Sequence, residues 1–194
     1  MREEQITVYE TPSGIPEADY IHGKAILLRP LTLSDTEDIL RWRNTPYVRE
    51  HFVFRDEMTK QMHEAWLLEK VMKGVVRQWI ICETDAREAA FRAVGSVYLR
   101  DIDQEVKTAE YGIFIGETDA LGKGYAVEAA RLVLQYAFQT LHLQTVGLRV
   151  YSDNERAKRG YAAAGFREVR SLPDVISTDG SRADMLWMEA KPGI

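Results

Sequence analysis

A stretch near the middle of the chain carries the residues with the clearest chemical potential. It runs Tyr111-Gly-Ile-Phe-Ile-Gly116-Glu-Thr-Asp-Ala-Leu121-Gly-Lys-Gly-Tyr-Ala126, from an expected strand through a short loop into an expected helix. Glycines let a backbone approach a ligand closely, and a helix start offers unpaired N–H groups and the positive end of the helix dipole. We therefore predict a binding site for an anion such as a pyrophosphate. The expected contacts come from Leu121, Gly122, Lys123, Gly124, Tyr125 and Ala126.

Two common phosphate-binding motifs do not fit this loop. A Walker A loop has four residues between its first glycine and Gly-Lys, whereas five separate Gly116 from Gly122. A Rossmann fingerprint needs glycine or alanine where Val127 stands, and an acidic residue after the next strand, which ends at Val150-Tyr151. For the loop by itself, a tight turn that starts a helix and binds no ligand stays open.

Glu110 is the candidate general base. Strand alternation puts it on the same face as Gly112 and Phe114, where a carboxylate would bind an ammonium group or relay its proton through water. A solvated strand residue is the alternative. The four histidines are scattered, and His63-Glu64 lacks the second histidine of a zinc-protease motif, so we predict no metal site.

A second group of candidates lies on an expected helix near the C-terminal end. Asn154 and Tyr161 are seven residues apart, so they share one helix face two turns apart, with Ala157 and Lys158 between them. We expect this face to meet the reactive end of a ligand.

Periodicity predicts the elements that must hold these residues. The expected strands are 24–29, 78–83, 93–100, 108–116, 146–150, 166–176 and 182–189. The expected helices are about 34–45, opened by a Ser34/Glu37 capping box and ended by Pro46, then 58–73, 123–141 and 152–165. This order predicts an α/β fold with a mixed, largely antiparallel sheet of about seven strands, four helices and a central parallel β-α-β crossover over 108–151.

Composition bounds the class of protein. The 194 residues, 45% hydrophobic and 28% charged, predict one folded domain, with a core at about 24–190 and an N-terminal extension at 1–23. The net charge of −5, without blocks of like charge, argues against nucleic acid and anionic membrane surfaces as partners. A single cysteine, Cys82, and no long apolar run favour a cytoplasmic location without a membrane span.

Two motifs resemble those of the GNAT superfamily of N-acetyltransferases. Gly122-Lys123-Gly124-Tyr125-Ala126, followed by Glu128-Ala129, resembles the acetyl-CoA pyrophosphate loop, whose pattern is Gln/Arg-x-x-Gly-x-Gly/Ala. Asn154-x-x-Ala157-x-x-x-Tyr161-x-x-x-Gly165-Phe166 resembles the second signature, and the resemblance spans roughly residues 24–190. Together with Arg41-Trp42-Arg43-Asn44, the loop looks more like the branch that contains the ribosomal-protein alanine N-acetyltransferases than like the aminoglycoside branch. Leu121 departs from the pattern at the Gln/Arg position, which removes a side-chain phosphate contact but leaves the backbone cradle.

The resemblance implies an enzyme that passes an acetyl group from acetyl-CoA to a primary amine. It gives Tyr161 the role of general acid toward the leaving thiolate, and Asn154 and Lys158 a place beside the cofactor. It also implies that the backbone of Phe114, Ile115 and Gly116 holds the pantetheine arm and the thioester. Because no Ser or Cys lies in a nucleophile pattern, we expect direct attack in a ternary complex.

Acceptor choice is expected to depend on Trp42, Arg43 and His51, together with neighbouring aromatic residues and the turn at 172–184. Core packing is the alternative for Trp42. The acceptor is a small-molecule or peptide amine: a protein N-terminus, an aminosugar nucleotide and a polyamine all stay open. A non-catalytic acyl-CoA-binding or sensory module on the same fold is the alternative function. Both a monomer and a homodimer are compatible with the sequence.

Overall fold

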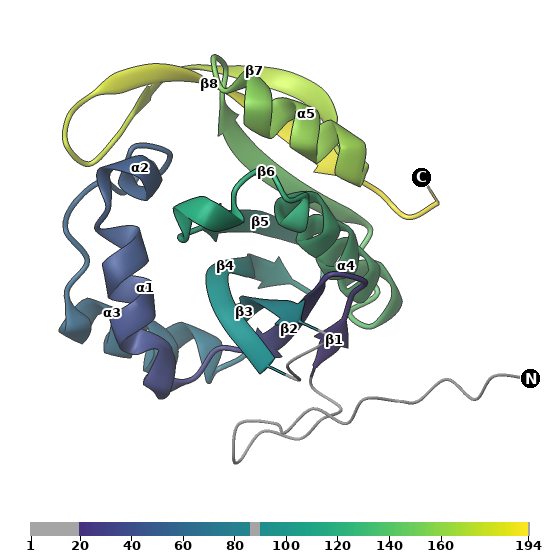
Figure 1. Ribbon diagram of the computed structural model, residues 1–194. Coiled ribbons are helices and arrows are strands. Elements are labelled where there is room, and N and C mark those ends of the chain that lie inside the picture. Colours follow the sequence, from purple (N-terminus) through teal and green to yellow (C-terminus); the bar gives the residue numbers. More distant parts are fainter. Residues whose placement is uncertain (1–19, 86–89, 194) are drawn as a thin grey trace, which may run out of the picture.

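One sheet organises the protein, and the computed structural model describes residues 20–85 and 90–193 of it. Within those residues the sheet has eight strands in the order β1-β2-β3-β4-β5-β6-β8-β7 (Figure 1). Neighbouring strands are antiparallel except β5 and β6, which run parallel. The strands are β1 (Ile21–His22), β2 (Ile26–Pro30), β3 (Arg77–Asp85), β4 (Ala90–Asp103), β5 (Thr108–Ile115), β6 (Thr145–Tyr151), β7 (Arg167–Ile176) and β8 (Arg182–Ala190).

Helices cover both faces of this sheet. The helices are α1 (Thr36–Arg43), α2 (Pro46–Arg49), α3 (Lys60–Trp66), α4 (Tyr125–Gln139) and α5 (Glu155–Ala164). Helices α1 to α3 lie on one side and α4 on the other (Figure 1). The buried apolar residues accordingly form two clusters, one centred on Trp42 and Ile80 under α1 and the other on Val133 and Leu148 under α4. The mixed sheet predicted from the sequence is confirmed.

Helix α4 is the crossover between the two parallel strands. Its buried residues, which include Ala130, Val133 and Ala137, repeat every three or four positions and pack against the sheet. The helix begins after Gly124, whose φ of 86° is in the left-handed region that favours glycine. The predicted parallel β-α-β unit is therefore present, and it fixes the start of α4 beside the end of β5.

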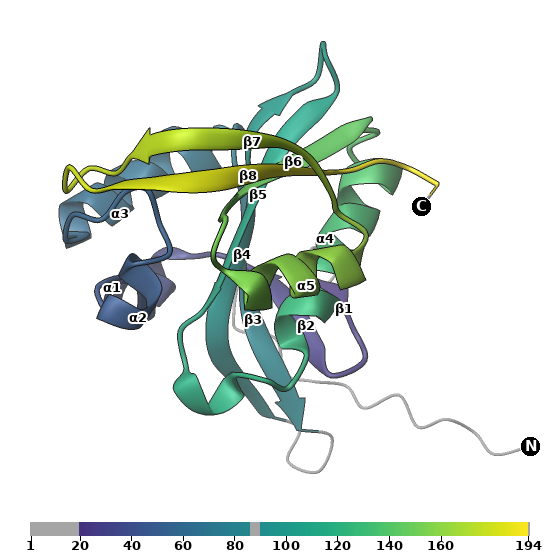
Figure 2. The same ribbon diagram turned by 90° about the horizontal axis from the view of Figure 1, so that it is seen from above.

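The two parallel strands pair only at one end and then separate. Thr108, Ala109 and Glu110 pair with Thr145, Val146 and Gly147, whereas β4 accompanies β5 over nearly its whole length (Figure 2). The Gly116 N–H donates to the Val94 carbonyl on the β4 side, 2.8 Å away. Because peptide groups alternate along a strand, those of Ile113 and Ile115 face the gap beside β6. The sheet is therefore open at its centre.

The structure differs from the predicted elements in four places. The first helix is preceded by a 3₁₀ turn at Leu33–Asp35, whose cap is formed by Asp35 accepting from the N–H and hydroxyl of Thr32, rather than by Ser34 and Glu37. Pro46 ends α1 but also begins the short α2. The helix expected at 58–73 is α3 followed by a π-helical turn at Leu67–Val71. Of the predicted N-terminal extension, residues 21–22 form β1, and 1–19 lie outside the described residues.

Candidate active site

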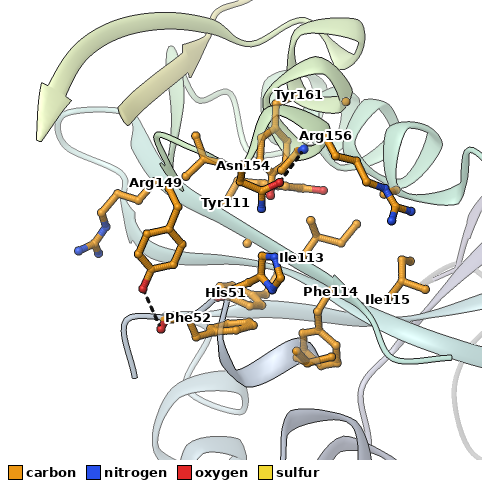
Figure 3. A pocket seen from close by; sticks show the side chains of 18 of the residues that line it. His51, Phe52, Tyr111, Ile113, Phe114, Ile115, Arg149, Asn154, Arg156 and Tyr161 are labelled. Atoms are coloured by element: carbon orange, nitrogen blue, oxygen red, sulfur yellow. Dashed lines mark hydrogen bonds between the residues drawn. The ribbon is translucent and has the colours of Figure 1, made fainter. Parts of the chain in front are cut away.

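A cavity of about 510 Å³ occupies the gap between β5 and β6 (Figure 3). Its walls come from the end of β5, the start of α4, one face of α5, and the segment that includes and follows α2. It is lined from both faces of the sheet, since Ile113 faces the α4 side and Gly112 the α1 side. Ligands entering from opposite faces of the sheet can therefore meet inside it.

The glycine loop forms one end of the cavity. Gly122 and Gly124 have φ values of 79° and 86°, and no atom lies within 4 Å of the position a Cβ would take at either. The amides of the first helical turn lack intrahelical partners, and Gly124 has no side-chain cap to satisfy them. Of the predicted loop contacts, Leu121, Gly122, Gly124, Tyr125 and Ala126 line the cavity. The shape and donors of this loop fit a diphosphate.

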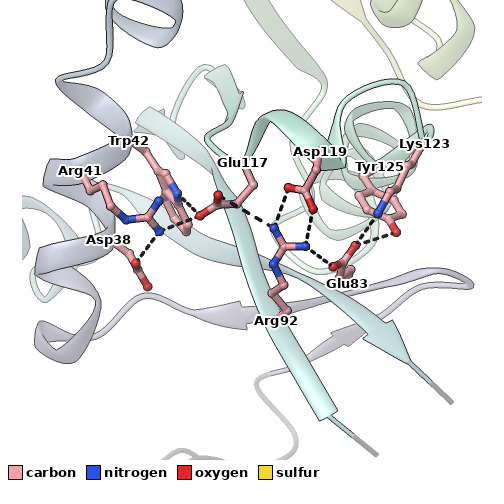
Figure 4. A network of polar contacts seen from close by, with 9 residues as sticks. All are labelled: Asp38, Arg41, Trp42, Glu83, Arg92, Glu117, Asp119, Lys123 and Tyr125. Atoms are coloured by element: carbon pink, nitrogen blue, oxygen red, sulfur yellow. Dashed lines mark hydrogen bonds and ion pairs between the residues drawn. The ribbon is translucent and has the colours of Figure 1, made fainter. Parts of the chain in front are cut away.

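Lys123 turns away from the cavity into a network of charged residues (Figure 4). Its Nζ lies 3.1 Å from Glu83, which also accepts from the Tyr125 hydroxyl at 3.0 Å. Arg92 joins Glu83 at 2.9 Å to Asp119 at 2.6 Å. The network ties the loop to β3 and β4, so Lys123 holds the loop in place rather than facing a ligand.

Trp42 and Arg43 lie behind the cavity wall, not in it. The Trp42 indole packs on Gly116, where a methyl group would lie 2.0 Å from Cγ, and its Nε1 donates to Glu117 at 2.8 Å. Arg43 is buried beneath the Phe52 ring, with the guanidinium carbon 3.7 Å from the ring centroid. Gly116 also lies outside the cavity lining, because its amide is used by β4. The sequence placed these residues near the cavity, but the residues that line it are their neighbours.

Helix α5 contributes a polar face. Asn154 caps the helix through Oδ1, which accepts from the Ala157 N–H at 3.0 Å, and this leaves its amide NH₂ free to donate. Asn154 and Tyr161 both line the cavity, as the helical spacing predicts. Lys158 does not, because its Nζ donates to the Ser152 carbonyl at 2.8 Å and pairs with Glu155.

Two tyrosines meet beside this face. The rings of Tyr111 and Tyr161 pack edge to face with centroids 6.2 Å apart, and Phe166 contacts both. Burial raises the pKa of Tyr161, so its phenol keeps its proton at neutral pH. The Tyr111 hydroxyl is buried, and among the described residues it has no hydrogen-bond partner. A ligand or water in the cavity would satisfy it.

An aromatic wall closes the opposite end. His51 and Phe52 face the cavity across from Asn154 and Tyr161 (Figure 3). His51 Nδ1 lies 2.9 Å from the Tyr47 carbonyl oxygen, and a carbonyl can only accept, so Nδ1 carries the hydrogen. The Nε2 lone pair of the neutral ring is then available for another proton.

Arg55 fastens the loop that carries this wall. It bonds to the Ser181 hydroxyl in the turn between β7 and β8 at 2.8 Å, and to the Tyr151 hydroxyl at the end of β6 at 3.0 Å. Tyr151 in turn donates to the Phe52 carbonyl, 3.1 Å away. Three segments far apart in the sequence are therefore tied together beside the aromatic wall, including the turn expected at 172–184.

Glu110 lines the cavity between two arginines. Its Oε1 accepts from Arg100 at 2.5 Å, and its Oε2 accepts from Arg149 at 2.9 Å. Because both oxygens already accept from cations, Glu110 is poorly placed to take a proton from a substrate. The arrangement fits a carboxylate that holds two guanidinium groups.

Sequence reasoning missed several lining residues. Arg100 lies opposite Glu110 in the ladder between β4 and β5, which a hairpin centred on residue 105 would have predicted. Arg156 follows Asn154 by two residues and extends from α5 at the rim of the cavity, a position that helical spacing alone does not select (Figure 3). To identify Tyr98 and Arg149 as lining residues, one must know the strand register and the position of the gap in the sheet. The sequence gives no direct signal for either.

The split sheet, the glycine loop and the single continuous cavity define the class of acetyl-CoA-dependent acyltransferases. The sequence model described as "Acetyltransferase (GNAT) domain" matches residues 25–167. The chain therefore belongs to the GNAT acetyltransferase family and is an N-acetyltransferase that uses acetyl-CoA as co-substrate.

Similar proteins include enzymes that acetylate polyamines. The spermidine N(1)-acetyltransferase of Escherichia coli K12 is 28% identical over 164 residues, which cover 84% of each chain. An uncharacterised protein of Methanocaldococcus jannaschii is 25% identical over 146 residues, 75% of this chain but only 28% of that protein. Among solved structures, spermidine N-acetyltransferase from Vibrio cholerae in complex with CoA and spermine matches with a TM-score of 0.78 at 22% identity, over 86% of this chain and 95% of that one.

Between residues 20 and 193, leaving out 86–89, no group of three His, Cys, Asp or Glu side chains is placed to hold a metal ion. No helix in the same part of the chain has the length and apolar character needed to cross a membrane.

Proposed function

We propose that the protein transfers the acetyl group of acetyl-CoA directly to the amine of a small molecule or peptide bound in the same cavity. The observation that carries this proposal is the continuity of the cavity. It extends from the open glycines of the loop, past Ile113 and Tyr161, to the wall at His51. A diphosphate-bearing donor and an amine acceptor can therefore meet at its centre.

The donor half of the cavity offers a contact for each part of acetyl-CoA, which supplies an activated acyl thioester. Amides of the loop and the start of α4 face the place for a diphosphate, and Arg156 adds a positive charge at the rim. The peptide groups of Ile113 and Ile115 face the gap, where they would hold the pantetheine arm and the thioester oxygen. The free NH₂ of Asn154 adds a donor beside them.

Proton transfer requires one group on each side of the reacting centre. Tyr161 is protonated and lies in the donor half, so it would give a proton to the departing thiolate. His51 presents Nε2 from the acceptor wall, so it would take a proton from the amine. We assign Glu110, the base expected from the sequence, to holding Arg100 and Arg149 instead.

The kind of acceptor and the location of the protein are part of this proposal. The relatives that acetylate spermidine support a small amine as acceptor, and the ribosomal-protein branch suggested by Arg41-Trp42-Arg43-Asn44 would instead require a protein N-terminus. A cytoplasmic location is supported by the single free thiol.

Two assays test the proposed function. Acetyl-CoA at millimolar concentration is expected to raise the melting temperature, whereas ATP at the same concentration is not. Thiol release with a panel of amines should then exceed the rate without amine. Cys82 will not interfere, because burial raises its pKa to about 11 and leaves little reactive thiolate. An equal thermal response to ATP, or no amine-dependent release from any acceptor class, would contradict the proposal.

A further inference from the structure

The acceptor end of the cavity has more positive than negative charge. Two guanidinium groups, those of Arg100 and Arg149, line it on either side of one carboxylate, Glu110. Asp101 lies 3.6 Å from Arg100 Nε, but its side chain is 79% exposed and it does not line the cavity. The side chains that face a bound acceptor here therefore carry a net positive charge.

A third arginine lies directly behind this surface. Arg43 is 5% exposed, stacks under the cavity-lining Phe52, and donates from one terminal nitrogen to the Phe54 carbonyl at 3.3 Å. Its other terminal nitrogen has no hydrogen-bond partner, and no carboxylate within the described residues forms an ion pair with it. Burial lowers the pKa of Arg43, but a guanidinium stays charged at neutral pH. An unpaired buried charge is unfavourable unless an anion approaches it.

Tyr98 also lines this part of the cavity. Its hydroxyl lies over Gly112, so close that a methyl group there would be 2.3 Å from the oxygen. Burial raises the pKa of Tyr98 and Glu110 adds to the increase, whereas Arg100, Arg43 and Arg149 act to lower it. Because burial raises its pKa, Tyr98 keeps its proton and supplies a hydroxyl donor in the cavity wall, opposite Gly112 in the ladder between β4 and β5.

We propose that the natural acceptor carries a carboxylate or phosphate group close to its amine, bound by Tyr98, Arg100 and Arg149 with Arg43 behind them. This inference rests on the proposed function and narrows its substrate class. Guanidinium groups bind both anions in a bidentate manner. A polyamine would instead bring further positive charge next to two arginines, so we expect it to be a poor acceptor despite the spermidine-acetylating relatives.

Amines of matched length test the proposal. Initial rates of thiol release are measured with 3-aminopropanoate, O-phosphoethanolamine, 3-aminopropanol and 1,3-diaminopropane, and with spermidine. We expect kcat/KM for at least one anionic amine to exceed that of the neutral alcohol by about tenfold or more, with both polycations below the alcohol. A ranking led by 1,3-diaminopropane or spermidine, or no preference, overturns the inference. If turnover is too slow to rank, equilibrium titration of the CoA-bound enzyme gives the ranking by the same criteria.

Variants locate the preference. Arg149→Ala should reduce the preference for the anionic amine by about tenfold, and Arg149→Lys should restore part of it. Arg167→Ala, on the edge strand β7 and outside the cavity, is the matched control and should keep the wild-type preference. An Arg149→Ala enzyme with the wild-type preference would contradict this assignment.

The same assay separates the sources of the anion. A phosphate preference directs the search to aminosugar nucleotides, and a carboxylate preference to amino acids and acidic peptides. Failure of the anion inference is also distinct from failure of the proposed function. An enzyme that prefers diamines still transfers acetyl groups, which contradicts only the anion inference. An enzyme whose thiol release does not increase with any of the amines contradicts the proposed function itself.

Discussion

Tyr161 is the residue whose chemistry can be tested most cleanly. Its ring is held by Tyr111 and Phe166, so replacing it with phenylalanine should preserve the packing and remove only the hydroxyl. Tyr161→Phe is expected to lower kcat by about 100-fold, because a positioned acid contributes roughly that factor or more. The KM for acetyl-CoA should change by less than about twofold. Unchanged kcat would remove the catalytic role.

The base is decided by a comparison of His51 and Glu110. If His51 takes the amine proton, His51→Gln should lower kcat by about 100-fold, whereas Glu110→Gln should lower it by less than about tenfold. Steady-state rates of the two variants at saturating acetyl-CoA measure the difference. The reverse order would restore Glu110 as the base predicted from strand alternation alone.

At the scale of elements, the role of the glycine loop in binding acetyl-CoA can be distinguished from the effect of backbone strain alone. Gly124 and Gly74 both have positive φ, 86° and 75°, and both have space for a methyl group. Alanine at either position should reduce the stability by about 1 kcal/mol, measured by urea unfolding. Only Gly124→Ala should also raise the KM for acetyl-CoA, by about tenfold. Equal KM values for the two variants would argue against a diphosphate at the loop.

The contact between α1 and α3 gives the protein a pH-dependent stability. His63 is buried against Thr36, its Nε2 has no hydrogen-bond partner within residues 20–85 and 90–193, and burial lowers its pKa below the ordinary 6.5. In the unfolded chain the imidazole of His63 takes up a proton at a higher pH than in the folded chain. The free energy of unfolding therefore decreases as the pH falls below about 6.5 toward the pKa of the folded state.

Replacing this histidine should reduce that loss. The free energy of unfolding in urea should decrease less between pH 7.5 and pH 5.5 for His63→Leu than for the wild type. The difference between the two decreases should be at most about 1.4 kcal/mol per pH unit. His22→Gln, at an exposed histidine, is the control and should follow the wild type. A decrease in His63→Leu equal to that of the wild type would contradict the role of His63.

The elements were largely predictable because each has a local signal. Amphipathic spacing marked α4, a left-handed Gly165 ended α5, and β-branched runs marked the strands. Local signals did not predict the elements whose formation depends on tertiary contacts. The two-residue β1 exists only through its pairing with β2, and the π-helical turn after α3 has no pattern in the sequence.

The site was predictable where it depends on the backbone and not where it depends on register. The loop glycines, Asn154 and Tyr161 were found from spacing because a glycine turn and one helix face fix their positions. Trp42 and Arg43 were expected to face the substrate, but sequence spacing does not tell a cavity wall from the layer behind it. The group formed by Arg43, Arg100 and Arg149 could not be predicted, because it depends on the relative positions of α1 and the strands β4, β5 and β6.

At the scale of the whole molecule, the proposed acetyl transfer depends on one break in the sheet. Helix α4 covers one face and α1 to α3 the other (Figure 2). The separation of β5 from β6 joins the two faces through one cavity. The donor half opens beside α4 and α5, and the acceptor half beside α2. This arrangement lets two substrates approach from opposite sides, which is what direct transfer requires.

A crystal structure of the protein with CoA tests this claim most directly. The account predicts the diphosphate at the amides of residues 122–126, the pantetheine arm between β5 and β6 along Ile113 and Ile115, and the sulfur near Tyr161. CoA bound elsewhere, or a gap between β5 and β6 that stays empty at saturating CoA, would contradict it.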